Sequence, residues 1–491
     1  MTAQSMIDTG VPTRRTEQRK QRLGQYFTSI QISRFMASMM SYRQKAVHIL
    51  DPGAGAGSLF TACVERICEL RKAPERVKVT AYEIDGSLTC NVDEALDKAG
   101  RLCARRGIEF SGRLIQGNFV TECAGSGPSG FTHVIINPPY RKIGIRSPEY
   151  DAMMCRTALR TTNMYAAFVS VAQDMLDRGG QMTFITPRSF CNGTYFQQFR
   201  GRMLRSMALR RIHLFDSRLS QFETDGVLQE NVIMCAKKGG RRAGVIVSSS
   251  TGPATPILYR KVRADDVVSP SDPRLFIHIA PDAGESAIVT KMRGLGATLD
   301  SLGLNVSTGK VVDFRVADAL RSSGRGRAVP LVRPSDISTR TVRFPAGGKH
   351  PSFIEASEKT TKLLVKNGTY VLVKRFTAKE ERRRIVAAVW TRKDYGTQLV
   401  GFENRVNYFY RPGCAIDNIT ARGLWAFLNS SAADMYLRQF NGNTQVNATD
   451  LRYMRYPPLD VLQAIGKSVG SGAGQDEIDN AVSRLALEKS V

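Results

Sequence analysis

The order of apolar and polar residues predicts alternating strands and helices in the first half of the chain. Short apolar runs rich in β-branched residues are typical of buried parallel strands, and apolar residues three or four positions apart are typical of helices. The predicted strands cover residues 47–50, 77–83, 112–118, 133–136, 182–187, 212–216 and 231–236, and the predicted helices cover 31–41, 59–70, 93–106 and 161–176. This alternation predicts an α/β fold with a Rossmann-like, doubly wound, mostly parallel sheet.

The pattern changes after the charged, glycine-rich segment 237–244, which reads as a linker. Beyond it come short β-type runs, and a helical pattern returns between residues 424 and 440. We therefore expect a flexible basic tail at residues 1–20, a sheet domain at 21–240 and a C-terminal mixed α/β domain at 241–491.

A glycine-rich turn follows the first predicted strand and opens with an acid. Gly53, Ala54 and Gly55 follow Asp51, and a helical pattern begins after Gly57. Glycines let the backbone approach a ligand closely, and the helix start offers free N–H groups. A carboxylate at residue 51 would repel a pyrophosphate but suits the ammonium group of an amino-acid-like ligand.

Two further strand ends carry polar side chains. Glu83 ends the second strand, where Rossmann-type sheets bind ribose hydroxyls, and Asp85 is the next candidate. The third strand ends at Asn118, followed by Phe119.

The fourth strand stops abruptly at Asn137-Pro138-Pro139-Tyr140. Two prolines remove two backbone donors and stiffen the segment, so its carbonyl groups are available as acceptors. With the Asn137 amide oxygen and the Tyr140 ring, the loop could bind a planar NH2 group and stack on the ring that carries it. A proline-rich strand-to-helix turn is the plain structural alternative. Because the first and fourth strands of a doubly wound sheet are neighbours, Asp51 and Asn137 should share one crevice.

These motifs and their order resemble those of the S-adenosylmethionine-dependent N6-adenine DNA methyltransferases of the gamma order, the modification enzymes of type II restriction-modification systems. The resemblance rests on residues 24–28, the turn at 51–57, Glu83, residues 117–119, the Asn137 loop and the strand at 182–187. In the first half of the chain the resemblance rests on these motifs. In the second half it rests only on position along the chain. One departure is Asn118, where the family usually has Asp.

The resemblance implies S-adenosylmethionine as cofactor and assigns site residues. The cofactor-binding set is Tyr26, Thr28, Asp51, Gly53, Ala54, Gly55, Glu83, Asn118 and Phe119. The catalytic set is Asn137, Pro138, Pro139 and Tyr140, with Phe222 as a second aromatic residue beside the target base. Residues 21–240 would form the catalytic domain, and residues 241–491 the target-recognition domain.

The charge balance points to a polyanionic partner. Seventy Lys and Arg residues face 44 Asp and Glu residues, a formal net charge of +26, which favours binding to phosphates through counterion release. We expect double-stranded DNA as partner, a cytoplasmic location and no membrane span, because the sequence has no run of about 18 apolar residues. The nine cysteines form no C-x-x-C pair, so we expect reduced thiols and no structural zinc.

Basic, polar and aromatic residues cluster in the second half, at residues 374–376, 382–384, 404–408 and 441–447. Arg, Asn and Gln side chains can make bidentate contacts with base edges, whereas Lys and Arg hold phosphates. A solvated surface is the alternative for each cluster, and the sequence singles out no base-reading residue. The basic, turn-rich residues 141–160 predict a loop over bound DNA.

The expected function is methyl transfer to N6 of a flipped-out adenine, which protects host DNA beside a separate restriction endonuclease that forms no stable complex with this chain. Three alternatives stay open at this point. One is an RNA or protein-glutamine methyltransferase of the same fold. Another is a non-catalytic DNA-binding specificity subunit. A fused endonuclease is the third, although no P-D…E-x-K pattern supports it.

Overall fold

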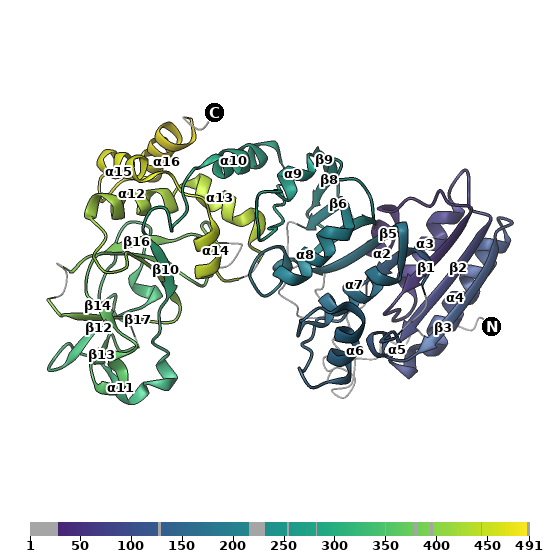
Figure 1. The fold of residues 1–491 in the computed structure, drawn as a ribbon, viewed down its shortest axis with the longest axis horizontal. Helices are drawn as coiled ribbons and strands as arrows, with labels where there is room; N and C mark the ends of the chain where they lie inside the picture. The colour runs from purple at the N-terminus through teal and green to yellow at the C-terminus, as the bar shows by residue number, and fades with distance from the viewer. Residues whose placement is uncertain are drawn as a thin grey trace, which may run out of the picture. The chain divides into compact units, whose positions relative to one another are not determined.

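The chain forms two compact units, which we describe separately. The computed structural model describes residues 28–125, 129–215, 231–252, 255–280, 282–348, 350–377, 381–392, 396–442 and 444–488. The first unit extends to Phe190 and continues from Tyr195 to Leu275, and the second comprises Cys191–Thr194 and the chain from Phe276 onward. Figure 1 labels the elements of both units.

The first unit is built on a nine-stranded sheet with the order β3-β2-β1-β4-β5-β7-β6-β8-β9. Its strands are β1 (Ala46–Asp51), β2 (Arg76–Glu83), β3 (Glu109–Gln116), β4 (Phe131–Ile136), β5 (Leu176–Pro187), β6 (Met207–Phe215), β7 (Asn231–Lys238), β8 (Val245–Ser250) and β9 (Leu258–Val262). Strands β1 to β5 run parallel, whereas β7 is antiparallel to β5 and β6. The predicted doubly wound sheet is confirmed. The predicted contact of first and fourth strands is also observed, because Ile49 lies opposite His133.

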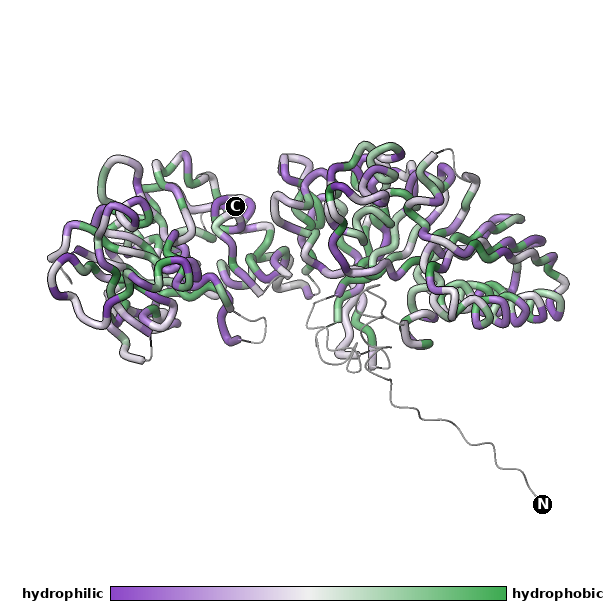
Figure 2. Tube along the Cα trace, turned by 90° about the horizontal axis from the view of Figure 1, so that it is seen from below, coloured by the Kyte–Doolittle hydropathy of each residue, from purple (hydrophilic) through white to green (hydrophobic). Residues whose placement is uncertain are grey.

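Helices connect these strands. They are α2 (Ile30–Ser38), α3 (Ser58–Cys68), α4 (Thr89–Ala104), α5 (Phe119–Glu122), α6 (Pro148–Thr157), α7 (Met164–Met175), α8 (Gln197–Ser206) and α9 (Ala264–Val267). Side-chain caps fix several of their starts; for example, Ser29 accepts from the Ile32 N–H and Asn163 accepts from the Ala166 N–H. Buried apolar residues of α2, β1, α3, β2 and α4 form one core cluster. Hydrophobic (green) and hydrophilic (purple) residues alternate along the trace in Figure 2.

The sequence analysis missed several helices of the first unit, of which α6 and α8 are the longest. The segment 141–160, predicted as a loop, contains α6. This helix begins with the Ser147 side chain accepting from the Tyr150 N–H at 3.3 Å and with Pro148 in its first turn, and it ends at Ala158 with φ 52°. The sequence does not predict α8 either. The loop prediction is therefore wrong for residues 148–157.

The first unit continues past the linker predicted at residues 237–244. Strand β8 pairs in parallel with β6, and β9 pairs with β8, so both extend the large sheet. The first unit accordingly reaches Leu275. The functional division of the chain at residue 240 stays a prediction.

The second unit has mixed α and β structure. One sheet has the order β10-β18-β15-β16 and the other has the order β11-β13-β12-β17-β14. Their strands are β10 (Asn305–Thr308), β11 (Leu320–Arg321), β12 (Ala328–Val332), β13 (Phe353–Glu355), β14 (Val365–Lys366), β15 (Tyr370–Lys374), β16 (Ala387–Trp390), β17 (Leu399–Phe402) and β18 (Val406–Tyr410). The helices are α10 (Ala283–Gly294), α11 (Glu358–Thr361), α12 (Asn418–Leu428), α13 (Ser431–Phe440), α14 (Ala448–Tyr453), α15 (Leu459–Ser468) and α16 (Gln475–Val482).

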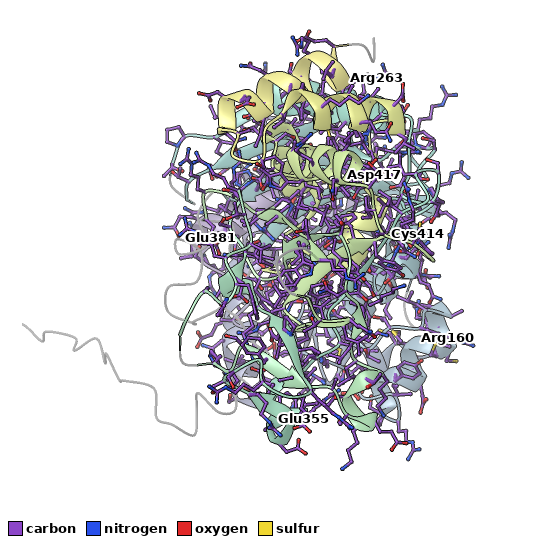
Figure 3. The ribbon with its side chains drawn as sticks, turned by 90° about the vertical axis from the view of Figure 1, so that its left-hand side faces the viewer. Arg160, Arg263, Glu355, Glu381, Cys414 and Asp417 are labelled. Carbon is purple, nitrogen blue, oxygen red and sulfur yellow. The ribbon has the colours of Figure 1, made fainter. Side chains whose placement is uncertain are left out.

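Two general features of the chain bear on its environment. All nine cysteines are free, and Cys414 is among those that are exposed (Figure 3). None of the helices in the described ranges combines the length and the apolar character that crossing a membrane requires.

Candidate active site

The glycine-rich turn holds a buried carboxylate. Asp51 ends β1 and is fully buried. One of its oxygens, Oδ1, accepts from the Gly53 N–H at 3.4 Å, whereas Oδ2 has no hydrogen-bond partner among the described residues. Burial raises the pKa of Asp51 to about 7. No ion pair to Asp51 is found in the part of the chain that the structure describes, so this carboxylate is available to a cationic group that reaches the turn.

Glu83 connects the end of β2 to the same turn. Its two oxygens accept backbone hydrogen bonds, Oε2 from the Gly55 N–H at 2.7 Å and Oε1 from the Asp85 N–H at 2.8 Å. Burial raises the pKa of Glu83, although both hydrogen bonds act in the opposite direction. The Asp85 side chain does not bind the turn; its Oδ1 accepts from the Ser87 N–H at 3.0 Å. Of the two acids, Glu83 is therefore the one bound to the turn.

Ile84 is a residue that the sequence reasoning missed. It lies between Glu83 and Asp85, yet its side chain is 46% exposed whereas both neighbours are buried. An exposed apolar side chain beside two buried carboxylates offers a flat contact for a ring. Its signal in the sequence was one apolar residue continuing the strand between two acids.

Asn118 is matched to a carboxylate that the sequence did not associate with it. Its Oδ1 caps α5 by accepting from the Val120 N–H at 3.1 Å, and its Nδ2 donates to Glu149 Oε1 at 3.3 Å. Arg141 also donates to Glu149 Oε1, at 2.9 Å. Burial opposes ionisation of Glu149, but the hydrogen bond from Arg141 and its positive charge leave the pKa of Glu149 below its ordinary value. An Asp at residue 118 could not donate, so Asn is the residue that fits this pair.

The ring of Phe119 is largely covered. It is 1% exposed and lies 5.1 Å from the Tyr82 ring and 5.3 Å from the Phe168 ring, measured between centroids. Its predicted stacking on a cofactor adenine stays a prediction, which this packing does not favour. Phe168 itself lies beside the turn, because a Cβ placed on Gly53 would be 3.8 Å from its ring.

The Asn137 side chain is fixed from both ends. Its Nδ2 donates to Thr28 Oγ1 at 3.0 Å, and its Oδ1 accepts from the Tyr140 hydroxyl at 3.1 Å. The Tyr140 hydroxyl also lies 3.4 Å from the Ile185 carbonyl oxygen on β5. Asn137 is half-buried. Because both oxygen and nitrogen have partners, the amide has a defined orientation.

The Asn137 loop and the glycine-rich turn lie next to each other. The Asn137 carbonyl oxygen would be 3.9 Å from a Cβ placed on Gly53. Pro138 is buried and Pro139 half-buried in the same loop. The structure thus brings together the predicted residues Thr28, Asp51, Gly53 and Asn137 with their neighbours. Tyr26 and Phe222, also predicted as site residues, lie outside the described residues.

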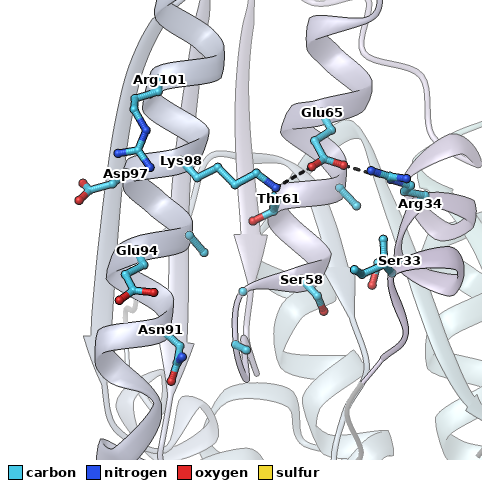
Figure 4. Close-up of a pocket in the computed structure, with 15 residues that line it drawn as sticks. Ser33, Arg34, Ser58, Thr61, Glu65, Asn91, Glu94, Asp97, Lys98 and Arg101 are labelled. Atoms are coloured by element: carbon cyan, nitrogen blue, oxygen red, sulfur yellow. Dashed lines mark hydrogen bonds and ion pairs between the residues drawn. The ribbon is translucent and has the colours of Figure 1, made fainter. Parts of the chain in front are cut away.

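A separate cavity of about 640 Å³ lies between α2, α3 and α4 (Figure 4). It reaches the glycine-rich turn at Ala56, Gly57 and Ser58 but is lined by none of the described residues predicted for the site. Glu65 spans it, accepting from Lys98 at 2.9 Å and from Arg34 at 3.2 Å. This cavity is therefore distinct from the point where Asp51 and Asn137 approach each other.

Comparison with known proteins identifies restriction-modification methyltransferases as relatives of this chain. The model of the Eco57I restriction-modification methylase family matches residues 87–222. The type II methyltransferase M.PstI of Providencia stuartii is 39% identical over 95% of this chain and 93% of its own length. M.BsuBI of Bacillus subtilis, also a type II methyltransferase, is 38% identical over 95% of both chains.

A solved structure shares the fold over most of the chain. The type IIL restriction-modification enzyme MmeI, solved in complex with DNA, aligns with a TM-score of 0.54 and 11% identity, covering 95% of this chain and 72% of its own. At this identity the likeness concerns the fold alone. The two long matches above 30% identity decide the family, and the chain belongs to the type II methyltransferases of restriction-modification systems.

Proposed function

We propose that this enzyme transfers a methyl group from S-adenosylmethionine to N6 of an adenine in duplex DNA. The observation that carries the proposal is the Asn137 amide, oriented by Thr28 and Tyr140 next to the buried, half-satisfied carboxylate of Asp51. Such an arrangement sets an acceptor for an amine beside a subsite for a cation.

The residues at the strand ends fit S-adenosylmethionine. The unpartnered Asp51 Oδ2 suits its ammonium group, the Glu83 carboxylate suits the ribose hydroxyls, and Ile84 offers apolar surface to the adenine ring. When bound, this cofactor supplies a methyl group activated by a positive sulfur.

The chain contributes positioning of the acceptor amine. The N6 lone pair of adenine is delocalised into the ring, which makes the amine a poor nucleophile. Acceptance of its two hydrogens by Asn137 Oδ1 and the Pro138 carbonyl would turn the lone pair out of the ring plane. Holding reactants in the correct geometry is worth about 7–11 kcal/mol in well-oriented systems. No side chain is required as a nucleophile in this mechanism.

The target adenine must leave the duplex to reach the Asn137 loop. Tyr140 then replaces part of the lost stacking, a contact worth about 1–3 kcal/mol per base. Its ring is half-buried and lies edge-on to Tyr165 with 6.4 Å between centroids, so it is held in a fixed direction. By resemblance, Phe222 would be a second aromatic residue beside the base.

The net charge of +26 supports duplex DNA as the substrate. The type II methyltransferase relatives support a role in a restriction-modification system, and we infer a separate restriction endonuclease as the other member of that system. RNA and protein-glutamine methylation are the competing activities, because both present planar amino or amide groups. A specificity subunit without catalysis would bind DNA but no cofactor.

The test uses the full chain with labelled S-adenosylmethionine and duplex DNA, RNA or a protein mixture. We expect label in duplex DNA, recovered as N6-methyladenine. Asn137→Ala should abolish transfer while the affinity for S-adenosylhomocysteine, measured by calorimetry, changes less than threefold. Asn91→Ala, at an exposed position on α4, is the matched control and should keep full activity. Label in another base or polymer, or an active Asn137→Ala enzyme, would refute the proposal.

A further inference from the structure

Burial divides the polar clusters of the second unit into internal and external residues. Asn407 and Asn441 are buried, and so is Arg384. Asn407 Nδ2 donates to the Val446 carbonyl at 2.7 Å, and Asn441 Nδ2 donates to Asp450 at 2.8 Å. These side chains, which resemble base readers in the sequence, instead hold the loops together from inside.

The residues left outside lie on four segments joined by hydrogen bonds. The Arg375 N–H donates to the Arg405 carbonyl at 2.9 Å, and the Asn404 N–H donates to the Val311 carbonyl at 2.8 Å. Arg375 further donates through Nη1 to the Asn404 carbonyl at 3.1 Å and through Nη2 to Gln445 Oε1 at 3.0 Å. We call the outward residues of these segments the arginine–aromatic surface; its members are Phe314, Arg315, Arg375, Phe376, Arg405 and Gln445.

Arg405 has a distinctive arrangement on this surface. Its Nε donates to both oxygens of Glu403, at 2.8 and 2.9 Å. The Glu403 side chain is 4% exposed, whereas that of Arg405 is 45% exposed. Within the described ranges neither terminal amino group of Arg405 has a hydrogen-bond partner. The buried carboxylate therefore fixes the guanidinium and leaves its outer donors available.

Two exposed aromatic side chains belong to the same surface. Phe314 is 80% exposed and Phe376 is 46% exposed, although both are large apolar rings. Arg315 lies 5.5 Å from the Phe314 ring centroid, and Arg375 lies 5.7 Å from that of Phe376. Exposed aromatic residues beside arginines are typical of surfaces that contact a partner, and bases stack on both groups.

The charges on the arginine–aromatic surface favour binding to DNA and indicate which DNA group each arginine contacts. The two carboxylates within these segments, Glu403 and Asp313, are each paired with an arginine, Arg405 and Arg333. Arg315 and Arg375 add positive charge that suits phosphates. Glu403, however, would repel a phosphate brought to Arg405. A neutral acceptor pair suits that guanidinium better, and guanine offers O6 and N7 in the geometry of its two outer donors.

We propose that Arg405, held by Glu403, reads a guanine in the major groove of duplex DNA, and that the arginine–aromatic surface is the DNA-contacting face of the second unit. This inference rests on the proposed DNA methylation and adds the residue that selects the sequence. Arg315 then supplies a phosphate contact, Arg375 holds the segments of Asn404 and Gln445 in place, and the two phenylalanines lie at the edge of the contact.

The test compares methylated sequences in a bacterial host that expresses the full chain. Sequencing that detects N6-methyladenine defines the wild-type site, and duplexes with each base pair replaced give the selectivity at each position. A bidentate arginine–guanine contact corresponds to a selectivity of about 5- to 150-fold. We expect Arg405→Ala to abolish the preference at one G·C pair and leave the other positions unchanged. Arg405→Lys and Glu403→Gln should weaken the same preference. The first removes the two parallel donors of the guanidinium, and the second removes the carboxylate that holds it in place.

Arg315→Ala should behave differently. Its affinity should fall by the same factor for all duplexes, and the slope of log affinity against log salt concentration should decrease by about the contribution of one phosphate contact. Arg484→Ala, at an exposed position in the same unit, is the control and should change neither quantity. If Arg405→Ala is inactive, the affinities of Arg405→Lys for cognate and substituted duplexes decide. Unchanged selectivity in Arg405→Lys, or a wild-type site without a G·C pair, would overturn the inference and leave DNA methylation intact. Absence of wild-type DNA methylation would refute the proposed function itself.

Discussion

At the scale of single residues, Asp51 links stability to ligand binding. Burial raises the pKa of its carboxyl from an ordinary value of 3.8 to about 7. Between about pH 4 and pH 7 the folded chain therefore holds a proton that the unfolded chain has lost. The free energy of unfolding consequently falls as pH rises through this window, by up to about 4 kcal/mol for this group.

This coupling gives a pH-dependent prediction. Asp51→Asn should raise the free energy of unfolding of the ligand-free enzyme at pH 8 relative to wild type, with little change at pH 4.5. The same variant should bind S-adenosylmethionine at least tenfold more weakly at pH 8, because the ammonium group loses its counter-ion. Urea unfolding at a series of pH values and calorimetric titration measure both effects.

Asp97→Asn, at an exposed position on α4, is the control and should leave both profiles unchanged. Equal affinities of wild type and Asp51→Asn at pH 8 would contradict the assigned role of Asp51.

The same scale shows why some site residues escaped the sequence. Asp51, Glu83 and Asn137 end strands, so their positions followed from the hydrophobic pattern. The sequence showed that Asn118 departs from the family pattern but not why. Its partner Glu149 lies 31 residues away, on a helix that the hydrophobic pattern did not predict. The burial of Phe119 was also invisible, since it depends on the packing of Tyr82 and Phe168 around it.

At the scale of elements, the junction between the glycine-rich turn and α3 is tightly packed. Gly57 precedes the helix with φ 80°, in the left-handed region that favours glycine. A Cβ at this position would lie 2.7 Å from the Ala95 Cβ and 2.8 Å from the Phe60 ring. The close approach of α4 therefore depends on glycine here.

Gly57→Ala should lower the free energy of unfolding of the first unit by about 2–4 kcal/mol, from left-handed strain and overpacking together. Gly107→Ala is the matched comparison, because Gly107 has φ 67° but a Cβ added there would meet no atom within 4 Å, and it should cost about 1 kcal/mol. Unfolding followed by circular dichroism measures the loss of free energy in both variants. Trp390 and Trp425 both lie in the second unit, so tryptophan fluorescence should report no matching change. Equal losses in the two variants would show that packing around Gly57 is not tight.

Element prediction succeeded where periodicity was strong and failed where it was weak. All of strands β1 to β5 were expected; β1, β2 and β4 contain clear apolar runs, whereas β5 begins six residues before the predicted strand. Helix α6 buries only Ala152, Met153 and Thr157, so its sequence carries little periodic signal. The pairing of β8 with β6 joins residues more than 30 positions apart, and no local pattern reports such a partner.

At the scale of the whole molecule, the chain passes from one unit to the other three times, after residues 190, 194 and 275. The short segment Cys191–Thr194 belongs to the second unit. There Asn192 Nδ2 donates to Asp450 Oδ1 at 2.8 Å, and the Ile277 N–H donates to the Cys191 carbonyl at 3.0 Å. Burial raises the pKa of Asp450 to about 6, despite hydrogen bonds from Asn447 and Asn192. The second unit thus needs a residue from within the first half of the sequence.

Asn192→Ala should lower the free energy of unfolding of the second unit by about 1–3 kcal/mol, the range for a buried acceptor that loses its partner. Tryptophan fluorescence during urea unfolding is the appropriate probe, since both tryptophans lie in this unit. Thr194→Ala, at an exposed position of the same segment, should have no measurable effect. An unchanged unfolding midpoint for Asn192→Ala would contradict this role.

The net charge predicted a nucleic-acid partner for the whole molecule but not the face that meets it. That face depends on which arginines are buried, and Arg384 and Arg405 differ in this respect although both lie in basic clusters. Sequence composition alone cannot separate them.

The segment Cys191–Thr194 also limits how relatives can exchange their sequence specificity. A hybrid joined at residue 275 would combine residues 191–194 of one parent with the rest of the second unit of the other. The buried amide–carboxylate pair would then be assembled from two lineages. A hybrid that exchanges the second unit should therefore also exchange these four residues.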